Sequence, residues 1–115
     1  MKTFGTVLIS VAFLLFWLGD KPTDAFDKND LQRLKTTNSC TSCDLRAANL
    51  NWADLREANL AHTDLRKAQL FMANLRGVNL TGANITNAVF EEANLSNVIW
   101  VDGKKCALRS VGQCD

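Results

Sequence analysis

The sequence predicts an all-β solenoid, a chain wound into short stacked coils, and three observations support this. An apolar residue recurs at every fifth position, a small or compact residue stands two places before it, and Asn or Asp nearly always lies between them. A period of five fits neither a helix nor an alternating strand. The apolar positions, called here the leucine ladder, are Leu45, Leu50, Leu55, Leu60, Leu65, Leu70, Leu75, Leu80, Ile85, Phe90, Leu95 and Trp100.

A fixed short period indicates units that bury their apolar faces only by stacking on neighbours. The ladder position and the small position are expected to face inward, and the other three positions outward. Four repeats close a square coil of 20 residues, so residues 41–100 make three coils. Phe90 and Trp100 are large for the ladder, but both fall in the last coil, where the core can open. Val78 is large for its small position and predicts a local bulge.

The pattern A-[N/D]-L-x-x resembles the pentapeptide-repeat family. The resemblance implies a right-handed quadrilateral β-helix of about three coils. The ends of the chain, a short helix before Cys40 and a cysteine-containing tail after Trp100, look like an exported bacterial, especially cyanobacterial, subgroup with cysteine-containing caps. The segments that carry the repeat include Ala48-Asn49-Leu50, Ala53-Asp54-Leu55, Ala58-Asn59-Leu60, Ala73-Asn74-Leu75, Ala83-Asn84-Ile85 and Ala93-Asn94-Leu95.

The N-terminus is typical of a secretory signal peptide, residues 1–25, cut after Ala25. Lys2 precedes the apolar run Val7–Leu18, which is shorter than the roughly 20 residues that span a bilayer. An uncleaved anchor is the alternative. The prediction is an exported protein in the periplasm or thylakoid lumen, or secreted, with no membrane association after cleavage.

The rest of the chain divides into three segments. Residues 26–39 are expected to form a capping helix, Phe26–Lys35, and a turn, with Asp27 as the N-cap. Residues 40–100 form the β-helix. Residues 101–115 lose the period and are expected to cap the last coil, because a solenoid needs its open edge covered.

Four cysteines allow three pairings, and the solenoid favours one. Cys40 and Cys43 enter the first coil, while Cys106 and Cys114 leave the last, about 10 Å or more away. A disulfide needs Cα atoms within about 7 Å. We therefore predict Cys40–Cys43 and Cys106–Cys114 as structural disulfides. A zinc site is disfavoured because its ligands must converge. A redox-active Cys-x-x-Cys pair remains an alternative.

One outward face differs from the others. Trp52, Phe71 and Met72 are expected to stack there as an exposed apolar patch, with Glu91 and Glu92 beside it. Such patches mark contact sites for a partner protein or for self-association, although a few exposed apolar residues are ordinary. Other faces carry columns of arginine beside aspartate and predict a self-compensated surface. His62, the one histidine of the chain, is expected to be an ordinary surface residue.

No catalytic, cofactor-binding or metal-binding residues are predicted, because the ladder fills the interior that a pocket would need. The chain has 13 basic and 12 acidic residues, which argues against nucleic-acid binding. The leading hypothesis is an exported, non-enzymatic structural or protein-interaction module. Some pentapeptide-repeat proteins bind topoisomerases by imitating DNA, but that alternative needs a strongly negative rod. Thiol-redox chemistry through Cys40 and Cys43 is the other alternative.

Overall fold

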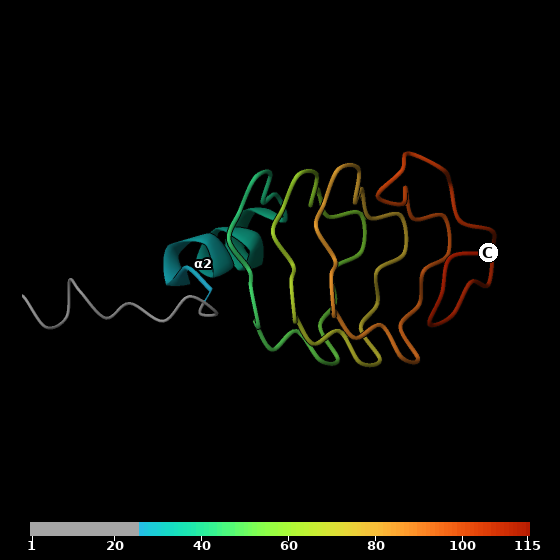
Figure 1. Ribbon diagram of the computed structural model, residues 1–115, viewed down its shortest axis with the longest axis horizontal. Coiled ribbons are helices and arrows are strands. Elements are labelled where there is room, and N and C mark those ends of the chain that lie inside the picture. The colour runs from blue at the N-terminus through green and yellow to red at the C-terminus, as the bar shows by residue number, and fades with distance from the viewer. Residues whose placement is uncertain (1–25) are drawn as a thin grey trace, which may run out of the picture.

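The computed structural model describes residues 26–115, so the predicted signal peptide lies outside the described residues. The backbone winds into stacked coils, with helix α2 (Lys28–Thr37) at the N-terminal end of the stack and the C-terminus at the other end (Figure 1). No helix within residues 26–115 is both long enough and apolar enough to cross a membrane.

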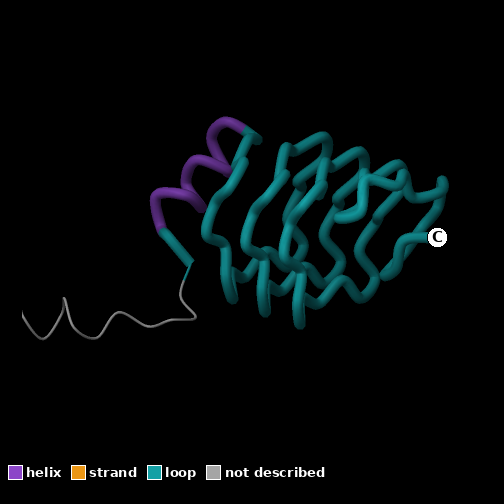
Figure 2. The backbone as a smooth tube through the Cα atoms, turned by 45° about the horizontal axis from the view of Figure 1, so that its top comes forward, coloured by secondary structure: helices purple, strands orange, loops and turns teal. Residues whose placement is uncertain are grey.

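Neighbouring coils are joined by isolated parallel bridges between residues 20 positions apart, which confirms four repeats per coil. Residues 26–115 contain no continuous strand, because a turn in every repeat leaves one bridging residue on each face (Figure 2). The predicted stacking of residues 20 positions apart is therefore confirmed, whereas residues 26–115 form single bridges rather than strands. The bridged pairs are Ser39 and Asn59, Asp44 and Asp64, Asn49 and Gln69, Asp54 and Asn74, Asn59 and Asn79, Asp64 and Asn84, Gln69 and Val89, Asn74 and Asn94, and Asn79 and Ile99.

The leucine ladder lies in the core. All its positions are buried except Ile85 and Trp100, which are partly exposed in the last coil. The Phe90 and Trp100 rings pack together there, with centroids 5.5 Å apart. The bulge predicted at Val78 is absent. Its N–H donates to the Leu75 carbonyl at 3.0 Å, as at the other corners. Val78 fits without a bulge because the buried side chains of its column grow larger toward the C-terminus, from Ala58 to Val78 and Val98.

Each repeat turns through a residue in the left-handed region of backbone space. These corner residues recur every five positions, from Ser42 to Asn97, with φ between 54° and 72°. The turn is closed by a bond across it; Ala48 N–H, for example, donates to Leu45 O at 3.1 Å. A positive φ at the third residue distinguishes a type II turn from type I and favours glycine or asparagine. Most corners here carry other residues, which the sequence pattern did not reveal.

The Asn or Asp that most repeats carry has a local role. Its side-chain oxygen accepts the backbone N–H two residues later, as Asn79 Oδ1 does from Thr81 at 3.0 Å and Asp44 Oδ1 from Arg46 at 3.3 Å. This Asx arrangement satisfies a corner N–H within its own coil. The polar residue is therefore part of the turn.

Helix α2 has the predicted N-cap, but it begins at Lys28 rather than at Phe26 and ends at Thr37 rather than at Lys35. The Asp27 side chain accepts the N–H groups of Asn29 and Asp30 at 2.8 and 3.2 Å, as an N-cap does. The turn predicted at residues 36–37 is instead helical. The Thr36 and Thr37 hydroxyls donate to carbonyls one turn back, which lets both residues continue the helix.

The helix closes the N-terminal edge of the stack. Leu34 is buried over the first coil. Asp44 N–H, which has no preceding coil to pair with, donates to Asp30 Oδ2 at 2.9 Å, and Asp44 O accepts Asp27 N–H at 2.9 Å. The cap therefore supplies both backbone partners that a previous coil would have given.

The C-terminal segment folds back on the last coil. Asn94 with Val111, and Ile99 with Lys105, form antiparallel bridges where all earlier bridges are parallel. Cys106 N–H donates to Val98 O at 2.8 Å. A reversed chain cannot continue the solenoid, so the stack ends here.

Candidate functional site

The structure brings together the three residues of the predicted apolar patch. Trp52 and Met72 occupy successive corners of one column, and their side chains are 67% and 38% exposed. Phe71 lies beside Met72 and is half-buried. The Trp52 and Phe71 rings meet edge to face, with centroids 6.0 Å apart and planes at 81°. The patch is therefore one contiguous surface rather than three scattered side chains.

The patch continues into an acidic groove. Phe71 forms one wall, the next coil contributes Glu91 and Glu92, and the C-terminal cap contributes residues 111–113 and Asp115. Val111 in this groove is 52% exposed. The glutamates follow from the 20-residue register. The cap residues do not, because no repeat predicts where the chain folds back.

Two arginines of the outward columns, Arg56 and Arg66, pair with an aspartate of their own repeat, whereas Arg76 follows Asn74 and has no such aspartate. In Asp54-Leu55-Arg56, Arg56 Nε and Nη2 donate to the two carboxylate oxygens of Asp54, both at 2.8 Å. The same fork joins Arg66 to Asp64, at 2.9 and 2.7 Å. The Arg66 hydrogen bond lowers the pKa of Asp64, and the Arg56 hydrogen bond lowers that of Asp54. The charges of Arg56 and Arg66 are therefore compensated within their own repeats.

A direct match to a family model agrees with this geometry over about half of the chain. The family model described as Pentapeptide repeats (8 copies) matches residues 43–77 and 73–99. Residues 43–99 are pentapeptide repeats. For such repeats a right-handed β-helix is implied, in keeping with the 20-residue register.

Two solved structures of pentapeptide-repeat proteins are similar to this chain. One is Rfr23 from the cyanobacterium Cyanothece 51142, at 26% identity and TM-score 0.40, covering 61% of this chain and 82% of that one. The other is HetL, involved in heterocyst differentiation regulation, from the cyanobacterium Nostoc sp. strain PCC 7120. It is 28% identical with TM-score 0.24, and the match covers 51% of this chain and 39% of HetL. No curated protein matches the chain.

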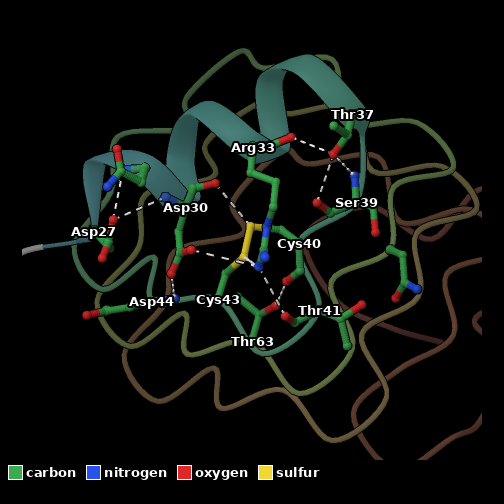
Figure 3. The surroundings of a disulfide bond; sticks show 12 residues. Asp27, Asp30, Arg33, Thr37, Ser39, Cys40, Thr41, Cys43, Asp44 and Thr63 are labelled. Atoms are coloured by element: carbon green, nitrogen blue, oxygen red, sulfur yellow. Dashed lines mark hydrogen bonds and ion pairs between the residues drawn. A yellow bond between two sulfur atoms is a disulfide. The ribbon is translucent and has the colours of Figure 1, made fainter.

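The cysteines lie at the two ends of the pentapeptide-repeat stack. The Cys40 and Cys43 sulfurs are 2.03 Å apart and the Cys106 and Cys114 sulfurs 2.02 Å, in the predicted pairing. Arg33 of α2 reaches over the first pair, with Nη2 2.6 Å from Cys43 Sγ (Figure 3).

That guanidinium would stabilise a thiolate if the first pair were reduced. Both sulfur-bearing residues are nevertheless buried, Cys40 at 0% and Cys43 at 2% exposure. Exchange requires an attacking thiolate to reach a sulfur, so α2 would first have to move away. The site therefore resembles an anchored structural bridge more than a redox centre.

Other candidate groups belong to the repeat. His62 is exposed, and its ring lies over Gly82 one coil on, where an added Cβ would collide with Nδ1. Asn79-Leu80-Thr81 matches the N-glycosylation acceptor pattern, but it forms an Asx turn of the repeat, in which the Thr81 hydroxyl donates to Asn79 Oδ1 at 2.6 Å. Across residues 26–115, no group of three or more His, Cys, Asp or Glu is placed to hold a metal ion.

Proposed function

We propose that this protein is an exported, non-enzymatic pentapeptide-repeat module that binds a protein partner, or a second copy of itself, through Trp52, Phe71 and Met72. The observation that carries the proposal is Trp52, which is 67% exposed at a left-handed corner. The turn does not need a large apolar side chain at this position, because Glu92, which occupies the corner two coils later in the same column, is charged. An exposed apolar surface of this kind is typical of contact sites.

The filled interior supports a binding role over catalysis. Leu65, Leu75 and Leu95 are 0% exposed, and the residues at the small positions of the same repeats are buried as well. Enzymes usually need a concave pocket with convergent polar groups. The hollows found on residues 26–115 lie on the surface, between exposed charged side chains.

Export is supported by the sequence of residues 1–25 and is compatible with the fold. Phe26 packs against the core, and Asp27 N–H donates to Asp44 O at 2.9 Å. Cleavage after Ala25 would leave both contacts intact. Mass measurement of the protein purified from its native host should give a chain that begins at Phe26; an intact residue 1–25 segment would contradict cleavage.

Light scattering and chemical crosslinking of the full chain test the binding role. The double variant Trp52→Asn/Phe71→Ser removes the patch, and asparagine tolerates the left-handed corner. Asn87→Ser is the matched control, because Asn87 is an exposed corner with φ 59° on another face. Loss of self-association or partner crosslinking in the double variant alone supports the proposal. If all three proteins behave alike, the patch is not a contact site.

A further inference from the structure

We propose that the occupant of the patch is an extended protein segment in which an apolar side chain is followed, two or three residues later, by Lys or Arg. The inference rests on the proposed function and adds the chemistry of the partner. It follows from the charges beside the patch and from the spacing of the coils.

The glutamates beside the patch differ from the aspartates of the solenoid, Asp44, Asp54 and Asp64, each of which pairs with an arginine. Asp54 and Asp64 each hold a forked arginine of their own repeat. Within residues 26–115, by contrast, neither Glu91 nor Glu92 has a basic side chain within 4.0 Å. Both are exposed, and the groove they line has Asp115 on its far side and no lysine or arginine. A negative surface left uncompensated beside an apolar one is complementary to a cationic, apolar segment.

The register sets the spacing of the two features. Trp52, Met72 and Glu92 are successive residues of one column, as are Asn51, Phe71 and Glu91 of the next. Successive coils are about 4.8 Å apart, so the acidic row lies roughly 5–10 Å beyond the aromatic rows. An extended chain advances about 3.3 Å per residue. An apolar anchor seated between Trp52 and Phe71 would therefore place a side chain two or three residues later at the glutamates.

The aromatic side chains suit such a segment in a second way. Trp52 presents an open ring surface, since only its contact with the Phe71 ring covers it among the rings described. A lysine or arginine stem can lie across this surface, with its charge attracted by the ring face. An acidic segment would meet like charges at Glu91 and Glu92 and would be rejected.

Fluorescence anisotropy with labelled peptides and the full chain tests the inference. The probe is Gly-Ser-Phe-Ser-Gly-Lys-Arg-Ser-Gly, acetylated and amidated. The first matched peptide replaces Lys-Arg by Glu-Glu, and the second replaces Phe by Ser. The third contains the same residues in another order, with Lys-Arg beginning seven residues after Phe. The probe is expected to bind about five- to tenfold more tightly than the acidic peptide at low salt. Most of that preference should disappear at 1 M salt, where the screening length is about 3 Å.

Variants separate the two proposals. Glu91→Gln/Glu92→Gln should remove the preference for the basic peptide and leave Phe-dependent binding in place. Trp52→Asn/Phe71→Ser should abolish binding of every Phe-containing peptide. If basic and acidic peptides bind equally and both need Trp52, the apolar contact stands and the basic partner is wrong. If binding does not depend on Trp52 and Phe71, the proposed function itself fails. Binding that is equally tight with Lys-Arg moved seven residues from Phe also overturns the extended-segment inference.

Discussion

Two neighbouring alanines should respond to glycine with opposite signs. Ala47 is a corner residue with φ 56°, whereas Ala48 is not among the residues with positive φ and is 0% exposed in the core. We expect Ala47→Gly to stabilise the fold and Ala48→Gly to destabilise it. Both changes remove one methyl group from adjacent positions, so the two variants differ in the backbone conformation and in the burial of the lost methyl.

The magnitudes follow from three terms. A left-handed conformation costs an L residue about 1–2 kcal/mol, and glycine is free of that cost. Glycine loses roughly 0.5–1 kcal/mol more than alanine in chain entropy on folding. Ala47→Gly should therefore gain about 0.5–1 kcal/mol. Ala48→Gly incurs the same entropy loss and also removes a buried methyl group, which is worth about 0.8 kcal/mol. The free energy of unfolding should therefore fall by about 1.5 kcal/mol.

Urea and thermal unfolding of both variants, with the disulfides oxidised, measure the difference. A gap of about 2 kcal/mol corresponds to roughly 8–16 °C in Tm for a domain of this size. Far-ultraviolet circular dichroism and tryptophan fluorescence should give the same transition if unfolding is two-state. If Ala47→Gly is destabilising to the same extent as Ala48→Gly, the corner conformations described here are wrong.

Three further predictions test the core, a buried hydrogen bond and an ion pair. Leu65→Ala should cost about 2–5 kcal/mol in urea unfolding, because Leu65 is fully buried; Leu108→Ala, at an exposed site, should stay within about 0.5 kcal/mol. Thr63→Val should lose about 1–3 kcal/mol, since it leaves a buried carbonyl without the hydroxyl that bonds it at 2.5 Å; an unchanged midpoint would rule out that bond. Asp64 has its pKa lowered from 3.8 by the Arg66 hydrogen bond, so its stabilisation is present above about pH 4 and is lost as the pH falls further. Asp64→Asn should flatten the stability profile in that acidic range, and an unchanged profile would contradict the pair.

The register could be predicted from the sequence because one physical rule repeats. A buried leucine every five residues leaves four faces per coil, and the coil then determines which residues stack. That is why the sequence alone places Trp52, Phe71 and Met72 side by side and predicts the pairing of the cysteines. The packing at Val78 was less predictable, because the neighbours in its own column, one coil before and one coil after, decide whether a larger side chain fits.

The features that the sequence could not supply arise where one residue type has several possible roles. The corner carries Ala47, Glu57 and Lys67 as readily as Gly77, so composition does not mark its left-handed backbone. Thr63 stands in a small position like an alanine, and only the fold shows that its hydroxyl reaches the Cys40 carbonyl. The cap residues around Val111 obey no period, so the far wall of the acidic groove was not foreseen.

The corner at Trp52 is where local and global requirements disagree. The left-handed backbone there costs any residue other than glycine about 1–2 kcal/mol. Its edge-to-face contact with Phe71 returns about 0.5–1.5 kcal/mol, so the internal terms roughly cancel. The side chain remains 67% exposed and therefore gains little from burial within this chain. The proposed contact with another molecule would supply the stabilisation that Trp52 lacks within its own fold, and the glutamates one coil beyond Phe71 and Met72 favour a positively charged partner.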